Sequence, residues 1–570
     1  MGIKKWKSSC QNLDNTIESL MRKYRLPHPV ALYFAARGIK EEMVPGFLNP
    51  KLAGFSDPYR FPGIQNAARR LWDAIINREP ILIHGDYDTD GITASALLSL
   101  VLRRNGGIVH SFIPHRFDDG YGFTPESLRK ALTAFGDCKV LVTVDCGITS
   151  SDAVADAVSR GIDPIITDHH EAGHELPAAL AVINPKIYPE LEDLHVLSGV
   201  GVAFKLSHAF IKYGREHNLG GFNTHLEDVL DYVALGTVAD IVPLLGENRI
   251  MVKYGIDILR RQFRPGIRAL IESSRLKNDL LPSDITFKLA PRINAAGRVG
   301  DANVAMSLLE SENIVEAYQF AQKLEEYNRI RQEKEQEIYQ EAKARIEESG
   351  QSRSNYALLV AGRDWHQGVI GIVASRLARD YNRPTIVLTI QDGEAYGSGR
   401  SIGSLNLVEV LGKTAPLLER FGGHPMAVGI GLRAEKIEDF HIALEKHVRE
   451  ELSADDLEEF IAYDGETTLG EIDDEFFKYL SQLAPFGHSN PRPLYRFNNL
   501  KVIKRYPVGR RHTRGFLVDR IGHQIEFIAF NVLPDDFSNE EIDILASPQL
   551  NNYYNVNRPQ LNILDFRTCY

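Results

Sequence analysis

The chain has 570 residues, of which 44% are hydrophobic and 25% are charged, a composition typical of a globular protein. No apolar run approaches the roughly 18 residues that span a bilayer, and the start, MGIKKWKSSC, lacks the apolar core of a signal peptide. Four scattered cysteines and a net charge of −11 argue against a disulfide framework, a structural zinc site and a basic surface over the whole chain, although a local groove can still be basic. We therefore expect a cytoplasmic protein with reduced thiols and no membrane segment.

The first 245 residues contain a mixed segment and then an alternation of strands and helices. Residues 1–75 carry several prolines that signal turns. From residue 80 onward, short runs of Val, Ile and Leu end in acidic or histidine residues and give way to helix-like stretches. This alternation predicts a doubly wound α/β domain over residues 76–245, in which ligands bind beyond the carboxyl ends of the strands.

The stretch HGDYDTDG, residues 84–91, places three carboxylates at alternate positions after the first of these strands. A calcium loop would require a bidentate Glu where Leu97 stands and a helix where the strand ILIH stands. A solvated acidic turn would explain the aspartates but neither the histidine nor the place at a strand end. We favour a catalytic divalent-metal site. Its candidate ligands in this stretch are His84, Asp86, Asp88 and Asp90.

Three later segments add polar residues in apolar surroundings. Asp145 follows the next strand in VDCG, where its alternative role is to cap a helix. The segment TDHH ends in His169 and His170, and adjacent histidines directly after a strand rarely serve packing. Such a mixture of histidine and carboxylate ligands suits Mn²⁺, Zn²⁺ or Mg²⁺. Asp240 in TVADIVPL needs a metal or a charge partner to offset burial, and a helix cap or an arginine pair are its alternatives.

The second half of the chain predicts three further regions. Residues 246–350 are mainly helical, and the stretch 313–348 contains no Gly or Pro, which predicts one long connecting helix or, alternatively, two helices with a break. Residues 351–457 again alternate strands and helices. Residues 458–570 contain short β-type runs that predict a small barrel. Its segment 501–520 carries seven Lys or Arg with aromatic residues between them, which indicates a single-strand-binding face or, alternatively, a solvated hairpin.

These motifs, in this order, resemble the DHH phosphoesterase superfamily, and over nearly the whole chain its RecJ family of single-strand-specific 5′→3′ exonucleases. The motifs that carry the resemblance are DYDTDG, VDCG, DHH, LGTVAD, PRINAAGR (291–298), WHQGVIGIVASRL (365–377), SGRS (398–401) and FGGHPMAVG (421–429). The resemblance implies two α/β lobes, DHH and DHH-associated, joined by a long helix and followed by an OB-type barrel. One departure is Ser489, which stands where the family pattern PFGxGNPxP has a glycine.

The resemblance also implies a site for two ions, Mn²⁺ or Mg²⁺. The first ion would be held by His84, Asp88 and Asp145. The second would be held by Asp90, Asp145, His169 and Asp240, with Asp145 bridging the pair. Asp86 would ligate or only orient the others, and Asp168 would orient a histidine. His170 would act near the scissile phosphate as a general acid or charge stabiliser.

The remaining candidates would bind the substrate strand. The resemblance implies that an arginine of PRINAAGR contacts the substrate phosphate, and Arg292 is favoured for this role over Arg298. Arginine suits phosphate because a guanidinium can bond two oxygens at once. The alternative is a structural pair with a carboxylate. Ser398 and Arg400 resemble the pocket for a 5′-terminal phosphate.

Two segments offer further contacts with the strand. Arg116 and Tyr121 provide a cation and a stacking ring, although a turn aromatic packed on the lobe would explain Tyr121 equally well. His424 would donate to a phosphate, or would be a packed structural histidine.

The resemblance predicts a monomeric single-stranded-DNA exonuclease that releases 5′-mononucleotides in recombination and repair. A helicase and a single-strand-binding protein are its expected partners. Another DHH enzyme, such as an oligoribonuclease, a cyclic-dinucleotide phosphodiesterase or a pyrophosphatase, is the main alternative, but these generally lack the long helix combined with a barrel. A scaffold that has lost its metal ligands is disfavoured because every expected ligand is present.

Overall fold

The structure, a computed structural model, describes residues 4–116, 120, 122–277, 279–403, 405–537, 540–551 and 558–568. Its internal contacts divide the chain into two compact units. The larger unit contains residues 6–290, 305–318 and the chain from residue 462 onward, and the smaller unit contains residues 4–5, 291–304 and 319–461.

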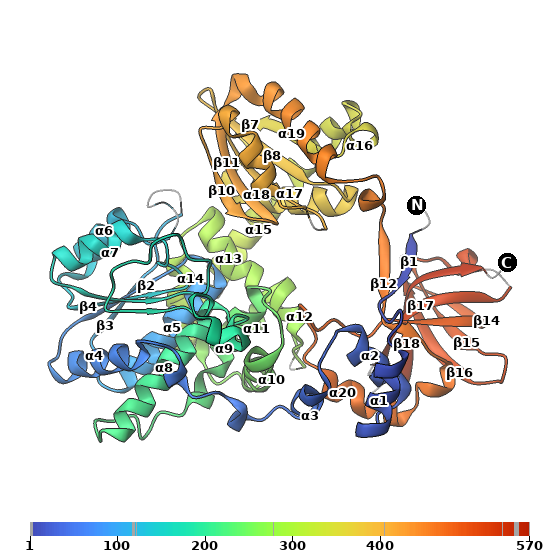
Figure 1. Cartoon of the computed structure of the whole chain (residues 1–570), viewed down its shortest axis with the longest axis horizontal. Coiled ribbons are helices and arrows are strands. Elements are labelled where there is room, and N and C mark those ends of the chain that lie inside the picture. Colours follow the sequence, from blue (N-terminus) through green and yellow to red (C-terminus); the bar gives the residue numbers. More distant parts are fainter. Residues whose placement is uncertain are drawn as a thin grey trace. The chain divides into compact units, whose positions relative to one another are not determined.

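The larger unit contains a five-stranded parallel sheet in the order β3-β2-β4-β5-β6. The strands are β2 (Ile81–Gly85), β3 (Val109–Phe112), β4 (Val140–Val144), β5 (Asp163–Thr167) and β6 (Ala181–Ile183). The helices around them are α4 (Ile64–Ile76), α5 (Thr89–Arg104), α6 (Pro125–Phe135), α7 (Ser151–Ser159), α8 (Gly199–Glu216) and α9 (Leu230–Ala239). In Figure 1, α6 and α7 lie on one side of the sheet and α4, α5 and α8 on the other. The predicted doubly wound α/β fold is confirmed.

The central strands of this sheet are buried along their whole length because helices cover both faces. Every residue of β2 and β4 is buried, as expected of parallel strands between helical layers. On the face covered by α4, α5 and α8, the Trp72 ring of α4 stacks on the ring of Phe210 in α8, with 4.5 Å between the centroids. The indole nitrogen of Trp72 also donates a hydrogen bond of 2.8 Å to the Phe210 carbonyl. This packing makes α4 part of the sheet's core.

The chain after the sheet is mainly helical, as predicted. Its helices are α10 (Gly246–Arg261), α11 (Pro265–Ser273), α12 (Pro282–Asp284), α13 (Ala290–Val299), α14 (Asn303–Glu310), α15 (Ile314–Glu348) and α16 (Gln351–Ser354), with a π-helical turn at Ile285–Leu289. Helix α15 is continuous over 35 residues, so the long connecting helix is confirmed and the alternative of two helices is wrong. Ion pairs four residues apart along it, such as Arg331–Glu335 at 2.7 Å, support the helical backbone.

The smaller unit contains a second α/β sheet, in the order β10-β11-β9-β8-β7. Its elements are β7 (Leu358–Arg363), α17 (Gln367–Tyr381), β8 (Thr385–Gln391), β9 (Glu394–Arg400), α18 (Leu407–Lys413), β10 (Arg420–His424), β11 (Ala427–Arg433) and α19 (Ile437–Glu451). Strands β7 and β8 are parallel, and the other neighbours are antiparallel. The two predicted α/β lobes are therefore both present.

A closed β-barrel forms the C-terminal part of the larger unit. Its elements are β13 (Gly465–Glu466), α20 (Asp474–Leu483), β14 (Tyr495–Val508), β15 (His512–Val518), β16 (Gln524–Phe530), β17 (Ile542–Asn551) and β18 (Arg558–Thr568). The ring closes because β14 pairs with β17 as well as with β15. This confirms the predicted barrel.

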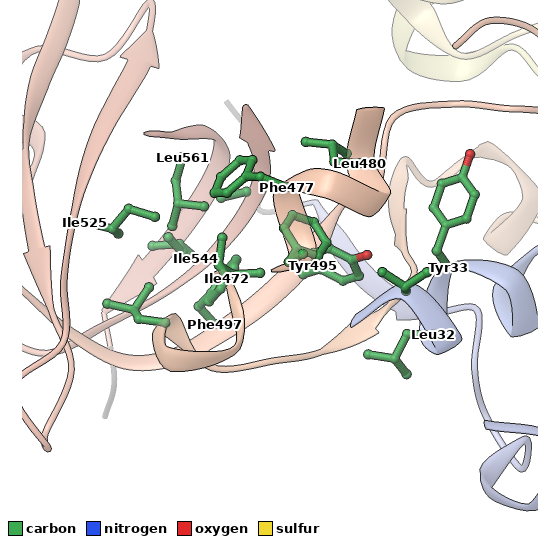
Figure 2. Close-up of a cluster of buried hydrophobic side chains, with 14 of the residues drawn as sticks. Leu32, Tyr33, Ile472, Phe477, Leu480, Tyr495, Phe497, Ile525, Ile544 and Leu561 are labelled. Carbon is green, nitrogen blue, oxygen red and sulfur yellow. The ribbon is translucent and has the colours of Figure 1, made fainter. Parts of the chain in front are cut away.

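The N-terminal helices complete the core of this barrel. The remaining elements of the chain are β1 (Lys5–Ser8), α1 (Asp14–Tyr24), α2 (His28–Ala36), α3 (Val44–Leu48) and β12 (Phe460–Tyr463). Figure 2 shows Leu32 and Tyr33 of α2 in one apolar cluster with side chains of α20 and the barrel strands. The Tyr495 hydroxyl donates to the Pro29 carbonyl at 2.7 Å, and Arg37 forms an ion pair with Asp464 at 3.0 Å. The segment before residue 75 thus contributes to two cores, α4 to the sheet and α1–α3 to the barrel.

Within the described residues, no helix combines the length and the apolar character needed to cross a bilayer.

Candidate metal centre

The carboxyl ends of three neighbouring strands bring the acidic motifs together. Asp86 follows β2, Asp145 follows β4 and Asp168 follows β5, and these strands pair in register, β2 with β4 and β4 with β5. Because parallel strands end at the same edge of a sheet, residues far apart in the chain become neighbours.

The start of α5 places two more carboxylates beside them. Asp88 caps the helix, its Oδ1 accepting from the amides of Asp90 at 2.9 Å and Gly91 at 3.1 Å. The Asp90 carboxylate turns toward the start of α8, where the amides of Gly199 and Val200 donate to it at 2.6 and 3.0 Å. Helix N-termini favour anions, so α8 stabilises the charged form of Asp90.

The backbone at Asp145 is left-handed, with φ of 61°. This conformation is uncommon for a residue with a side chain, although Asp tolerates it better than most. Gly199 leaves the room that the side chain of Asp145 occupies, since a Cβ at Gly199 would stand 2.4 Å from Asp145 Oδ1. The backbone conformation of Asp145 therefore sets the direction of its side chain, and the lack of a side chain at Gly199 leaves space for the carboxylate.

The two histidines of the site have different electrostatic roles. Burial lowers the pKa of His169 to about 3, which keeps its imidazole neutral and able to coordinate a metal. Burial tends to lower the pKa of His170, but a hydrogen bond of 2.7 Å between its Nδ1 and Asp168, together with the charges of nearby aspartates, raises the pKa overall. Asp168 is satisfied by three backbone amides as well, those of Ile148, His169 and His170. It therefore orients His170, as expected of an outer carboxylate.

Three sets of side chains are close enough for each to hold an ion, with donor atoms within 4.8 Å of one another. The sets are Asp86, Asp88 and Asp145; Asp90, His169 and Asp240; and Asp145, His169 and His170. His169 Nε2 lies 3.2 Å from Asp145 Oδ1 and 3.7 Å from Asp240 Oδ2. The last set shares members with the other two, so the geometry offers two neighbouring positions.

The concentration of carboxylates in this cluster indicates that it binds cations. Burial, and then the charge of Asp88, raises the pKa of both Asp86 and Asp90 to about 7. Burial and neighbouring carboxylates also raise the pKa of Asp145 and Asp240 well above the usual value. In the described part of the chain, buried oxygens of these two residues, Asp145 Oδ1 and Asp240 Oδ2, have no hydrogen-bond donor. Carboxylates packed this closely need positive charge, and an oxygen-rich set with one imidazole fits Mn²⁺ or Mg²⁺.

His84 is placed differently from the prediction. It is fully buried at the end of β2, with its Nε2 2.9 Å from the hydroxyl of Ser127 and its Nδ1 3.9 Å from the thiol of Cys146. None of the three sets found among the described residues includes it, whereas Asp86, the less certain candidate, belongs to one. A role for His84 as a ligand stays a prediction.

Of the predicted strand-binding residues in the larger unit, the structure describes Arg116. Its guanidinium lies 5.1 Å from the ring centroid of Tyr87, inside the DYDTDG motif. Tyr121 lies outside the described residues.

The other predicted substrate contacts belong to the smaller unit. Arg292 Nε bonds Glu325 at 2.5 Å, so the carboxylate pair that was its alternative is present. Arg298 donates to the Gly368 carbonyl at 3.2 Å. On β9, Arg400 donates to the hydroxyl of Ser398 at 2.8 Å.

His424 lies in the same row of this sheet as Arg400. The strand register pairs Arg400 with Ala427 and Ala427 with His424. The hydroxyl, the guanidinium and the imidazole therefore share one end of the sheet.

The sequence did not predict the contributions of backbone amides or of glycines that leave space for a ligand side chain. The amides of Gly199 and Val200 hold Asp90, and a Cβ at Gly236 would meet Thr93 at 2.2 Å and Asp90 at 2.8 Å. A serine cap followed by Gly-x-Gly at the head of an apolar helix, SGVGVAF, was a readable signal for the first of these.

Three family models match the chain. The DHH family, N-terminal domain, matches residues 80–237, the DHHA1 domain matches residues 354–450, and the RecJ OB domain matches residues 463–565.

Two curated relatives match nearly the whole chain. The single-stranded-DNA-specific exonuclease RecJ of Dickeya dadantii is 37% identical over 557 residues, which cover 94% of this chain and 96% of that protein. The protein of the same name from Bacillus subtilis is 35% identical over 566 residues, covering 96% of this chain and 69% of its own length.

A solved structure shares the architecture. RecJ in complex with Mn²⁺ from Thermus thermophilus aligns with a TM-score of 0.83 and 27% identity, over 99% of this chain and 80% of that one. The Mg²⁺ complex of RecJ from the same organism aligns with a TM-score of 0.76 and 25% identity, over 99% of this chain and 79% of that one.

Proposed function

Because the chain belongs to the RecJ family of single-stranded-DNA-specific exonucleases, we propose that it degrades single-stranded DNA from the 5′ end to 5′-mononucleotides, in recombination and repair. It is a hydrolase of phosphodiester bonds, and its cofactors are two Mn²⁺ or Mg²⁺ ions. The observation that carries the proposal is the group of overlapping sets formed by Asp86, Asp88, Asp90, Asp145, Asp240 and the two histidines. Over the residues that the structure describes, buried oxygens of Asp145 and Asp240 in these sets have no hydrogen-bond donor.

The residues of this cluster would divide the work between binding and proton transfer. When bound, a pair of cations stabilises the attacking and leaving oxygens of an in-line displacement at phosphorus. Asp145 would contribute to both positions because it belongs to two of the three sets. His169 would serve as a neutral nitrogen ligand, since its pKa is lowered to about 3 by burial.

His170 would act on the substrate rather than on the ions. Although burial opposes it, the hydrogen bond and the charge of Asp168 raise the pKa of His170, which favours its protonated form. Such a group can donate a proton to the leaving oxygen or a hydrogen bond to the phosphate.

The smaller unit would recognise the 5′-terminal phosphate. Ser398 and Arg400 touch each other on β9, and His424 stands in the same row. Arg292 and Arg298 would add phosphate contacts, and in the case of Arg292 the strand would compete with Glu325 for the guanidinium. Arg116 and Tyr121 would contact the strand near the DYDTDG motif.

The barrel supports a long single strand over a dinucleotide as the substrate. Lys504 pairs with Phe516 and Tyr506 with Arg514 across β14 and β15, and all four side chains are exposed. A cation beside a ring, repeated along a strand pair, is the combination that single-strand binders use.

The proposal is tested by digesting single-stranded DNA labelled at the 5′ or the 3′ end with Mn²⁺ present. We expect 5′-labelled mononucleotides first, and loss of degradation of at least about hundredfold in Asp145→Asn, because the shared ligand position is lost. Asp152→Asn, an exposed carboxylate on α7, is the matched control and should retain activity. Release of label first from the 3′ end would contradict the polarity, and a fully active Asp145→Asn would contradict the metal site.

The setting of the enzyme is proposed on the same family grounds. We expect a cytoplasmic monomer that works with a helicase and a single-strand-binding protein. The described cysteines, Cys10, Cys138 and Cys146, are all free thiols, which agrees with a reducing compartment. Light scattering of the purified chain would test the monomer.

A further inference from the structure

A small apolar cavity of about 250 Å³ lies next to the metal centre, within the larger unit. Val238, Ile241 and Val242, which flank Asp240 in the chain, form one wall, and Phe287 and Phe486 contribute aromatic rings. Consecutive Cα atoms are about 3.8 Å apart, so this wall begins within one residue of a carboxylate of the cluster. We call this cavity the 240 pocket.

The backbone around the 240 pocket is unusual at two places. Ile241 has φ of 60°, a conformation that is a genuine outlier for a β-branched residue. Phe287 lies in the π-helical turn Ile285–Leu289, a form that is rare and often occurs at functional sites. Unusual backbone conformations persist only where the surrounding structure enforces them, and they cluster at active sites and ligand-binding sites.

The strained backbone presents apolar side chains to solvent. Phe287 is 76% exposed and Ile241 is 58% exposed, although both line a cavity. Because these two exposed apolar side chains line the same cavity, they form one apolar surface, and such surfaces often mark a binding groove.

The chemistry of the walls limits what that ligand can be. The lining residues that the structure describes include no carboxylate, ammonium or guanidinium group, and His488 is the most polar of them. Arg492 is not among the lining residues, but its guanidinium lies 5.0 Å from the ring centroid of Phe486, which is one of them. The cavity is smaller than the roughly 300–1,000 Å³ of sites that enclose a whole small molecule. It therefore suits one flat, uncharged ring system attached to an anionic chain that passes the arginine.

We propose that the 240 pocket receives an unstacked nucleobase of the strand that is being cut, with the ring of Phe287 stacking on it and Ile241 packing on its edge. A base held here would fix the register of the strand relative to Asp240 and the phosphate at the metal centre. Every base has a π-face, so this contact accepts all four bases and suits an enzyme that degrades any sequence. The inference rests on the proposed single-strand nuclease activity and adds a base-binding subsite to it.

The test compares Phe287→Ala with the unmodified chain in release of the first 5′ nucleotide from a strand of about 20 nucleotides. Stacking on one base accounts for roughly a fivefold to hundredfold change in affinity, so KM should rise by that factor while kcat at saturation changes by less than about twofold. Phe287→Trp should restore KM, and Phe287→Leu should not. Phe263→Ala is the matched control, since Phe263 is 75% exposed in the same unit but is not among the residues that line the 240 pocket.

A second measurement separates a base contact from a general disturbance. A series of strands carries one abasic residue at successive positions from the 5′ end. At one position the abasic residue should weaken binding to the unmodified chain but not weaken binding to Phe287→Ala any further. The reason is that the missing base and the missing ring remove the same contact. Equal KM for Phe287→Ala and the unmodified chain, or additive losses at every abasic position, would overturn the subsite and leave the nuclease activity standing. A chain that leaves single strands intact would overturn both.

Discussion

At the scale of single residues, the metal centre depends on two glycines as much as on its carboxylates. Gly199 donates its amide to Asp90 and, through its missing side chain, makes room for Asp145. Gly236 makes room in the same way for Asp90 from α9. The ligand geometry is thus fixed by the approach of α8 and α9 to the sheet, and a single methyl group at either position would disturb it.

Gly199→Ala is predicted to impair catalysis strongly. The new Cβ would stand 2.4 Å from Asp145 Oδ1 and 2.5 Å from its Cβ, so the carboxylate must move, and a displacement of about 1 Å can cost on the order of hundredfold in rate. Gly412→Ala is the control, because Gly412 lies in α18 with open space where a Cβ would go. That change should leave the rate unaltered, since a helical alanine is favoured over glycine. Initial rates in Mn²⁺ measure both, and equal rates for the two variants would contradict the assigned role of Gly199.

The sequence predicts which side chains gather but not how the backbone holds them. The acidic and histidine motifs are readable because their residue types are rare at apolar strand ends, and the structure brings most of them together. The contacts of Gly199 and Ser127 depend on helices packed from elsewhere in the chain. Ser489 illustrates the reverse case. It stands where the family pattern has glycine, and its φ of 56° shows the backbone conformation for which glycine is favoured.

At the scale of elements, one buried arginine connects helices α3, α10 and α20. Arg249 of α10 is 2% exposed and donates hydrogen bonds to four carbonyls, those of Phe47, Gln482, Leu483 and Ala484, at 2.7 to 3.0 Å. Its guanidinium also lies 3.8 Å from the ring centroid of Phe47. Among the described contacts of this guanidinium there is no carboxylate, so its charge is satisfied by backbone dipoles.

Replacing Arg249 with Met is predicted to destabilise the larger unit by about 3 kcal/mol or more, because several buried carbonyls would lose their donor and each costs roughly 1–3 kcal/mol. Differential scanning fluorimetry should show a lower unfolding midpoint. Arg268→Met, which removes an exposed pair with Glu272 on α11, should leave the midpoint unchanged. If the two variants unfolded at the same temperature, Arg249 would not connect these elements as described.

The elements themselves were predictable where their own pattern decides them. Strands β2, β4 and β5 follow from short apolar runs, and helix α15 follows from a long stretch without Gly or Pro. The N-terminal helices were not predicted, since the surface that buries α2 lies more than 430 residues later in the chain. A helix such as α2, buried on nearly all sides, shows no amphipathic period for a sequence to reveal.

At the scale of the whole molecule, charge links stability to metal binding. The net charge of −11 is distributed over the chain. The larger electrostatic cost to the stability of the fold arises where the aspartates of the cluster lie close together. Burial and mutual repulsion raise the pKa of Asp86 and Asp90 from about 3.9 in an unfolded chain to about 7 in the folded one. The metal-free folded state therefore holds protons that the unfolded state has already released.

The direction in which stability changes with pH follows from these raised pKa values. A carboxyl group whose pKa is raised by folding destabilises the fold as pH rises from about 4 to about 7, and the full penalty is present above about 7. Bound cations remove that penalty, whereas at low pH protons compete with them. Mn²⁺ is therefore predicted to raise the unfolding midpoint more at about pH 8 than at about pH 5.5, and a chelator should lower it more at the higher pH.

Calorimetry with Mn²⁺ or with EDTA at both pH values measures this difference. The double variant Asp145→Asn with Asp240→Asn removes two of the raised carboxylates, so the metal-free protein should gain stability at about pH 8 and lose most of its response to Mn²⁺. Asp152→Asn, on the exposed face of α7, should behave as the unmodified chain does. An equal Mn²⁺ effect at the two pH values would mean that the carboxylates of the cluster are ionised throughout, and that repulsion among them does not limit the stability of the fold.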